Sequence, residues 1–208
     1  MEEICYLKNM KITKLEGQKN RKRFNLEIDG SFYAGIDQSL VSDYDLYVGK
    51  DITGKELIEI KNENTFRQGL KKAFSLLETR MNSEIELERK LRRKFDFTAT
   101  KKVIKRLKEL GYINDEVFAE NWVKDRGRTR GQFMLRSELR QKGVDNNIIE
   151  AAIEGRDLDE VVRNATELVT KKKWDVEDKW KKRKLVTNYL SRRGYNYNVI
   201  EKVIKNLE

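Results

Sequence analysis

A nine-residue pattern that occurs three times constrains the fold of this chain more than any other feature. The copies lie at 87–95, 135–143 and 186–194, and each places two apolar residues four positions apart, followed by basic residues and usually by glycine. They recur with a period of about 48 to 51 residues, which predicts one supersecondary unit used several times, with neighbouring units sharing a core. We therefore expect an elongated, curved array that offers a binding surface rather than a single catalytic pocket.

The residue types that the chain lacks narrow its chemistry. Its 208 residues include no histidine, which removes the commonest general base, the usual metal ligand and every histidine-containing triad. They include no proline, which suits a nearly continuous helical chain because proline breaks helix interiors. The carboxylates are scattered, and the single cysteine, Cys5, has no histidine partner. We expect no enzyme activity, no catalytic residues, no metal and no cofactor.

The cysteine count and the distribution of apolar residues predict the cellular compartment in which the protein works. One cysteine cannot form an intrachain disulfide, which favours the reducing cytoplasm. No apolar run approaches the ~18 residues that a membrane span needs. The acidic segment Met1–Cys5 lacks the basic-then-apolar pattern of a signal peptide. We expect a cytoplasmic monomer that has no membrane partner.

The net charge of +10 is concentrated in the middle of the chain. Residues 1–79 are neutral, residues 80–142 carry +8 and residues 143–208 carry +2. Such a concentration of positive charge favours a polyanionic partner, either a nucleic acid or an anionic protein assembly. The alternative is a solvated helical surface that has no partner.

The N-terminal region has the alternation of a small antiparallel sheet. Apolar side chains alternate strictly over 24–28, Asp29-Gly30 is a preferred pair for a type I′ hairpin turn, and 31–36 supplies the partner strand. A looser alternation at 11–16 brings the expected number of strands to three. A sheet of this size is not very stable alone, so we expect it to dock on the helices that follow.

The rest of the chain has a helical pattern with recognisable helix ends. Ser83 and Glu86 have the spacing of a capping box, Thr98 is placed to cap the next helix, and Gly143 and Gly194 follow helices as C-terminal caps. The predicted fold is mainly α, with three tandem three-helix repeats behind a small N-terminal antiparallel sheet. The expected domains are a β-rich extension at 1–60 and helical repeats at 61–112, 113–155 and 156–208.

The apolar residues of the repeated blocks are expected to form the helical cores. We expect Trp122, Trp174 and Trp180 to pack there as well. For these three tryptophans, stacking on nucleic-acid bases is the alternative.

Basic residues end each repeated block, and others occupy the turn at 126–130. A cation near a helix C terminus has a simple explanation, because the helix dipole stabilises it by ~0.3–1 kcal/mol. That explanation accounts less well for the same placement in all three blocks, so we expect a shared functional surface. The candidate partner- or DNA-binding residues are Arg89, Arg92, Arg93, Lys94, Arg126, Arg128, Arg130, Arg136, Arg140, Lys142, Arg192 and Arg193.

Two motifs around the second block resemble those of a known family. Residues 115–119 have the form D-E-x-F-A, and residues 131–143 have the form G-x-x-x-L-x-x-E-L-x-x-K-G. The combination resembles the RecX family of recombinase regulators, and the resemblance extends from about Ala73 to the C terminus. The segment 29–36 resembles the N-terminal extension of longer members. Two departures are Phe95, which stands where glycine is common, and the lack of proline in the first two repeats.

The resemblance implies tandem three-helix repeats that bind the RecA recombinase filament on single-stranded DNA. Such regulators lie in the helical groove of the filament and inhibit its ATP hydrolysis, its strand exchange in DNA repair and its co-protease activity in the SOS response. The expected partners are the RecA filament and single-stranded DNA, bound directly or through the filament. The alternative is a stand-alone basic nucleic-acid-binding module, since three-helix units also serve as helix-turn-helix readers.

Overall fold

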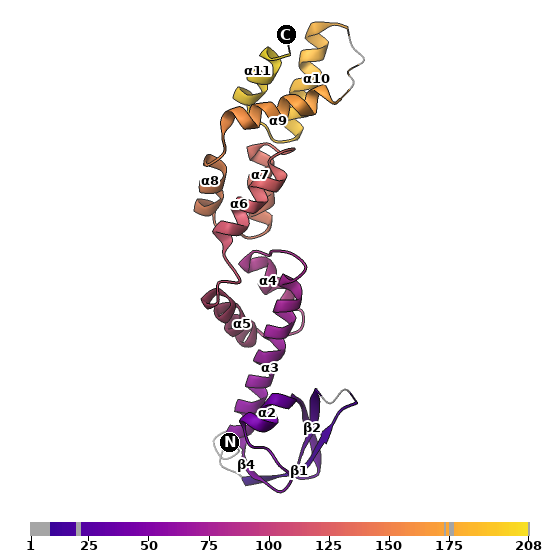
Figure 1. Cartoon of the computed structure of the whole chain (residues 1–208), viewed down its shortest axis with the longest axis vertical. Helices are drawn as coiled ribbons and strands as arrows, with labels where there is room; N and C mark the ends of the chain where they lie inside the picture. The colour runs from indigo at the N-terminus through magenta and orange to yellow at the C-terminus, as the bar shows by residue number, and fades with distance from the viewer. Residues whose placement is uncertain (1–8, 20–21, 173, 175–176, 208) are drawn as a thin grey trace. The chain divides into compact units, whose positions relative to one another are not determined.

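A computed structural model describes residues 9–19, 22–172, 174 and 177–207 (Figure 1). Within these residues the chain forms ten α-helices and one antiparallel sheet of four strands, and the strands lie near the N terminus. The prediction of a mainly α-helical chain with a small N-terminal sheet is confirmed. The boundaries proposed between the repeats stay a prediction.

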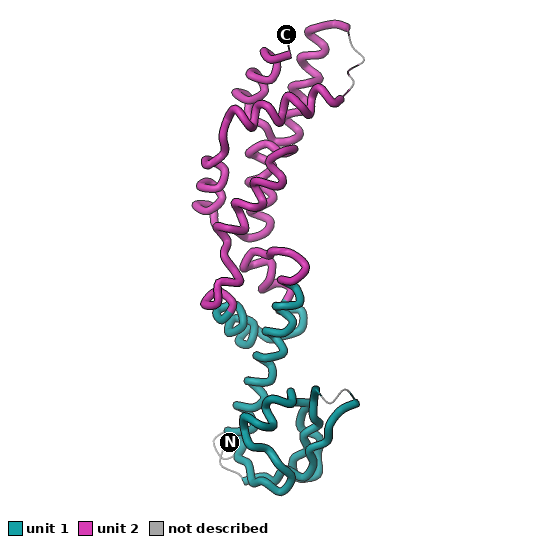
Figure 2. Tube along the Cα trace, in the orientation of Figure 1, with its two compact units in different colours: residues 1–76, 91–106 teal, residues 77–90, 107–208 magenta. Residues whose placement is uncertain are grey.

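The chain divides into two compact units (Figure 2). The first contains residues 1–76 and 91–106, and the second contains residues 77–90 and 107–208. The division passes through helix α4 (Glu84–Leu91) and helix α5 (Phe97–Glu109), so each of these helices contributes residues to both units.

The sheet of the first unit has the strand order β3-β2-β1-β4, and all neighbours are antiparallel. Its strands are β1 (Asn9–Gly17), β2 (Arg23–Ile28), β3 (Ser31–Asp37) and β4 (Asp51–Thr53). The prediction of three strands was wrong, because β4 adds an edge strand that pairs with β1 through Ile52 opposite Met10. Three residues are too few for an alternating pattern to be recognised in the sequence.

Helix α3 (Gly54–Leu77) packs against this sheet, as expected for a sheet that needs support. The buried Asn64 fixes the docking, because its side chain donates to the carbonyl of Gly35 at 3.0 Å and accepts from the amide of Asp37 at 3.1 Å. Satisfying these groups removes the cost of burying an amide without partners. The short helix α2 (Gln38–Asp43) contributes Leu40 to the same apolar core.

The second unit contains two groups of helices, each with its own core. The first group is α6 (Asp115–Arg126), α7 (Gln132–Gln141) and α8 (Asn146–Glu154), and the second is α9 (Leu158–Thr170), α10 (Lys179–Arg192) and α11 (Tyr197–Lys205). The apolar residues of the repeated pattern lie at the centre of these cores, as predicted. They are Leu135, Leu139, Val186 and Leu190, all at most 2% exposed.

Most helices begin with a side-chain cap, and one predicted cap was wrong. Asn114 caps α6, Asp145 caps α8 and Asp157 caps α9, each by accepting from a backbone amide of the first turn. Thr98 does not cap α5. Instead, Asp96 accepts from the amide of Ala99 at 2.8 Å, so this helix begins one residue before Thr98.

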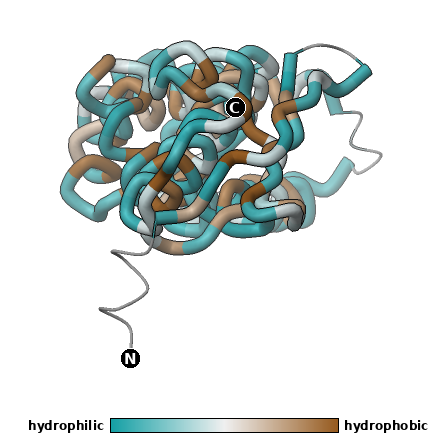
Figure 3. The backbone as a smooth tube through the Cα atoms, turned by 90° about the horizontal axis from the view of Figure 1, so that it is seen from below, coloured by the Kyte–Doolittle hydropathy of each residue, from teal (hydrophilic) through white to brown (hydrophobic). Residues whose placement is uncertain are grey.

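Where the trace can be followed, hydrophobic stretches are short and are interrupted by hydrophilic residues (Figure 3). Accordingly, none of the helices in the described part of the chain is long and apolar enough to cross a membrane.

Candidate partner-binding surface

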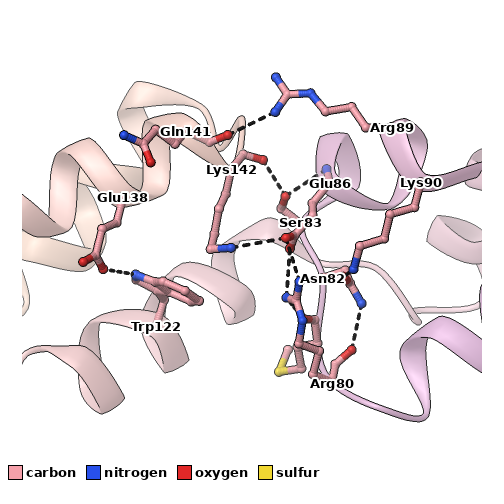
Figure 4. Close-up of polar contacts among 11 residues, drawn as sticks. Arg80, Asn82, Ser83, Glu86, Arg89, Lys90, Trp122, Glu138, Gln141 and Lys142 are labelled. Atoms are coloured by element: carbon pink, nitrogen blue, oxygen red, sulfur yellow. Dashed lines mark hydrogen bonds and ion pairs between the residues drawn. The ribbon is translucent and has the colours of Figure 1, made fainter. Parts of the chain in front are cut away.

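The C-terminal end of α7 meets the N-terminal end of α4 inside the second unit (Figure 4). Ser83 is fully buried there, and its hydroxyl accepts from the amide of Glu86 at 3.2 Å while donating to the carbonyl of Lys142 at 2.6 Å. Arg89 donates to the neighbouring carbonyl of Gln141 at 3.1 Å. Ser83 is therefore the N-cap that the sequence predicts, and it also joins the two repeated blocks.

The predicted capping box is only half formed. Glu86 does not reach back to the start of α4, because its carboxylate binds Arg80 at 2.7 Å and Lys142 at 3.3 Å (Figure 4). Asp115 accepts instead from the amide of Glu84, the first residue of α4, at 2.8 Å. Burial raises the pKa of the Asp115 carboxyl, whereas this hydrogen bond lowers it in part.

Lys142 is held by the protein itself. Its ammonium lies 4.3 Å from the ring centroid of Trp122, and the side chain is only 18% exposed. The indole of Trp122 donates to Glu138 at 2.9 Å, which fixes the ring under the ammonium. Lys142 therefore acts as a structural residue of this junction rather than as a free contact for a partner.

The hydrogen bonds from Arg80, together with those from Lys142, lower the pKa of Glu86 from 4.5 to about 2. A carboxylate whose pKa is depressed on folding stabilises the protein above its unfolded pKa, and the contribution is lost as pH falls through the folded pKa. We expect Glu86→Gln to lower the free energy of unfolding at pH 7 by about 2 kcal/mol, after allowance for the exposure of Arg80. The difference from wild type should shrink between pH 4.5 and about 2.

Urea unfolding of both proteins at several pH values measures this difference. Glu167→Gln is the matched control, because Glu167 on α9 and its partner Lys171, the residue that follows the helix, are both largely exposed. A difference for Glu86→Gln that stays constant across this range, or one no larger than that of the control, would contradict the role of the Glu86 charge.

A second junction in the same unit repeats the first. The amides of Gly131 and Phe133, at the start of α7, donate to the carbonyls of Arg193 at 2.8 Å and of Gly194 at 3.0 Å. Gly131 has no capping side chain, so the C-terminal end of α10 supplies the cap for α7. The positive end of one helix dipole thus meets the negative end of the next.

The helix ends approach each other closely at these two junctions, which explains why glycine is needed at 143 and 194. It also explains why Phe95 can stand where the resembling family commonly has glycine. Gly143 and Gly194 have φ values of +80° and +82°, and a Cβ at either position would overlap the first turn of the helix that carries the preceding block, at Ile85 or Met134. Phe95 ends the first block, before which no earlier copy of the pattern supplies a helix start to approach. Its φ is not positive, and glycine is not required there.

Four of the twelve predicted contact residues are only partly exposed and bind other groups of the protein. One is Lys142, and Arg136 forms a bidentate pair with Glu150 at 2.6–2.9 Å, which raises the pKa of the guanidinium. Arg130 lies 3.4 Å from Glu138, and Arg193 donates to the carbonyl of Thr129 at 3.3 Å. These four side chains stabilise the helical groups, so their side chains are poorly placed for a partner.

The other eight predicted residues are exposed, although Arg89 donates to Gln141 and Arg140 donates to Asn146 at 3.0 Å. The basic residues at the end of α10 lie next to those of the turn at 126–130. The bond from Arg193 to Thr129 crosses 64 residues of sequence and brings the C-terminal end of α10 to the turn at 126–130. Among the described residues, neither Arg128 nor Arg192 has an ion-pair partner. We call Arg126, Arg128 and Arg192 the arginine surface. The remaining exposed residues are Arg89 and Arg140 in the same unit, and Arg92, Arg93 and Lys94 in the first unit.

Arg156 is not among the contact residues predicted from the sequence. It lines a groove of about 480 Å³ between α6, α8 and α9, next to Arg128. Its guanidinium donates to the carbonyl of Gly127 at 2.9 Å, and burial lowers its pKa. It lies outside the repeated blocks, and its position depends on the packing of two helical groups, so the sequence carried no signal for it.

The three tryptophans differ in whether their side chains are packed. Trp122 stacks on Phe118 at 5.8 Å between centroids, and Trp174 packs edge-on against Tyr189 at 5.6 Å, as predicted. Trp180 does not pack, because 70% of it is exposed on the first turn of α10. The prediction of a packed side chain was wrong for this residue.

The chain matches two sequence profiles of one family. "Regulatory protein RecX N-terminal domain" matches residues 10–53, and "RecX, second three-helix domain" matches residues 114–153. The regulatory protein RecX of Clostridioides difficile strain 630 is 31% identical over 201 residues, which cover 94% of this chain and 95% of that protein. The chain belongs to the RecX family.

Other RecX proteins are similar over much of their length. The regulatory protein RecX of Listeria innocua is 32% identical over 91% of this chain and 73% of its own length, and one from Listeria monocytogenes is 35% identical over 78% and 62%. A crystal structure of a regulatory protein RecX matches with a TM-score of 0.70 at 22% identity, over 95% of this chain and 99% of that chain, and so shares the fold. These relatives are named as regulatory proteins and not as enzymes.

The residues of the RecX motifs in this chain form the contacts at its junctions. Asp115 binds the first amide of α4, Phe118 and Leu139 lie in the core, and Glu138 and Lys142 hold Trp122 between them. The motifs that reveal the family therefore specify how helical groups join, and the exposed side chains outside these contacts remain the candidates for a binding surface.

Proposed function

We propose that this RecX protein binds the RecA filament on single-stranded DNA and inhibits its ATP hydrolysis, strand exchange and co-protease activity, in DNA repair and in the SOS response. Membership of a family of regulatory proteins supports a role exerted on another protein. Within the residues that the structure describes, no group of three or more histidine, cysteine, aspartate or glutamate side chains could hold a metal ion. The protein works in this proposal as a cytoplasmic monomer.

The observation that carries the proposal is the arginine surface beside the second junction. Arg128 and Arg192 come from different helical groups, and the bonds between 129–131 and 193–194 hold their backbones in one place. Side chains that carry charge without an internal partner remain available for phosphates or acidic protein side chains. A filament on DNA offers both, and the repeated junction presents basic residues at successive positions along the helical groups.

Binding to single-stranded DNA with and without RecA tests this proposal against the stand-alone nucleic-acid module. A labelled oligothymidylate is titrated with the protein at about 0.15 M salt, bare or coated with RecA and a non-hydrolysable ATP analogue. We expect at least about tenfold tighter binding to the coated DNA, equivalent to about 1.4 kcal/mol. Equal or tighter binding to bare DNA, with a steep salt dependence, would favour the stand-alone module.

A further inference from the structure

The first two turns of α10 form an exposed, cationic stretch of helix. All residues from Lys179 to Leu185 are exposed, and Val186 is the first buried residue of the helix. Five of the six residues from 179 to 184 are lysine or arginine, and the sixth is Trp180. This segment is absent from the predicted contact residues because it does not belong to the repeated pattern.

This charge is placed where the helix itself disfavours it. Cations near a helix N terminus face the positive end of the dipole, and like charges three or four residues apart destabilise a helix by about 0.2–0.5 kcal/mol per pair. Lys181 and Lys184 are such a pair, as are Lys179 and Lys182. The dipole explanation that suffices for a basic residue at a helix C terminus does not apply here.

The four lysines have little internal compensation. Arg183 pairs with Glu201 at 2.8 Å, but none of Lys179, Lys181, Lys182 and Lys184 forms an ion pair with a residue in the described part of the chain. Local features that cost stability without a folding benefit are expected at functional sites.

Trp180 gives this surface a second property. It is 70% exposed, and the ammonium of Lys184 lies 5.5 Å from its ring centroid. A large exposed aromatic side chain among cations matches the surfaces that bind single strands, where bases stack on an aromatic ring and lysines follow the phosphates. A duplex keeps its bases stacked on one another, so it does not offer them to such a ring.

We propose that Trp180, Lys181 and Lys184 bind single-stranded DNA directly, with the indole stacked on a base and the two ammonium groups on phosphates. The inference deepens the proposed function, because single-stranded DNA is a component of the filament, and it adds a site apart from the arginine surface. A lipid surface fits less well. The exposed turns offer only Trp180 and Leu185 as large apolar residues, short of the apolar face of an interfacial helix.

The test uses the full chain and a labelled oligothymidylate without RecA, at about 50 mM salt, where electrostatic binding is strong. We expect Trp180→Ala to weaken binding about tenfold, and Trp180→Phe, which keeps a stacking ring, to weaken it much less. Lys181→Glu with Lys184→Glu should weaken binding at least tenfold and lower the slope of log affinity against log salt by about 1.4, at about 0.7 per phosphate contact. Lys71→Glu with Lys72→Glu on exposed positions of α3 is the matched control and should bind as wild type.

Two results would overturn the inference. One is the lack of a difference between wild type and variants on the bare oligothymidylate, whether none of them binds it or all bind it equally. The other is loss of binding to the RecA-coated strand alone, which would assign the patch to an acidic protein face. Wild-type inhibition of RecA is measured separately, so a failure of the proposed function stays distinguishable from a failure of this site. Thermal melting by circular dichroism verifies that the exposed substitutions leave the fold intact.

Discussion

Gly194→Ala is expected to lower the free energy of unfolding by about 3–5 kcal/mol, whereas Gly111→Ala costs only about 1 kcal/mol. Both glycines end helices with positive φ, +82° at Gly194 and +74° at Gly111, so both substitutions carry the same backbone strain. They differ in their surroundings. A Cβ at Gly111 would meet nothing within 4 Å, whereas one at Gly194 would lie 2.8 Å from the Cβ of Met134 and overlap its backbone amide.

Urea unfolding followed by far-ultraviolet circular dichroism compares the two variants under the same conditions. The backbone strain from the positive φ is common to both variants and cancels in the comparison. The additional loss of unfolding free energy at Gly194 therefore measures the close approach of α10 to α7. Equal losses for the two variants would show that the junction relaxes to admit a methyl group. The backbone bonds from Gly131 and Phe133 to 193–194 would then contribute little to joining the helical groups.

Arg128→Glu combined with Arg192→Glu is expected to raise the concentration of protein needed to inhibit RecA by at least about tenfold, while leaving the fold intact. Both side chains are exposed, and neither has an ion-pair partner among the described residues, so the reversal breaks no internal salt bridge. Each reversal replaces an attraction for phosphate or carboxylate by a repulsion, and about 1.4 kcal/mol in total gives a factor of ten.

The matched control again carries Lys71→Glu and Lys72→Glu, which change the net charge by the same amount on α3. DNA-dependent ATP hydrolysis by RecA measures inhibition, and thermal melting verifies folding. If the control loses inhibition to the same degree, net charge governs the effect. If the arginine variant inhibits as well as wild type, the arginine surface is not part of the interface.

The sequence predicts local features of this fold well and long-range ones poorly. Apolar spacing within one helix identified Leu135 and Leu190 as core, and the glycine at the end of a block identified the positive φ of Gly143 and Gly194. These features depend on a few neighbouring residues. β4 was missed because three residues carry too little pattern, and Thr98 was mistaken for a cap because Asp96 stands two positions before it.

The candidate site depends on partners that are distant in sequence, and this limits what the residue types alone predict. Arg136 and Arg140 occupy similar positions in one block, but only Arg136 meets a carboxylate, from Glu150 on the next helix. Arg193 differs from Arg192 because its carbonyl and its guanidinium both bind the turn near Thr129. Trp180 looked like a core residue because of its residue type, although Arg183 and Lys184, which lie three and four positions further along α10, give it no apolar neighbour on its own helix.

ATP hydrolysis by RecA tests most directly whether this RecX protein acts on the RecA filament. The cognate RecA is assayed at fixed single-stranded DNA and about 0.15 M salt while this protein is titrated. We predict inhibition at fewer than one copy per RecA monomer, because a regulator that acts on a filament affects many subunits at once. Undiminished hydrolysis at stoichiometric excess would contradict the account and leave direct nucleic-acid binding as the function that the basic surfaces serve.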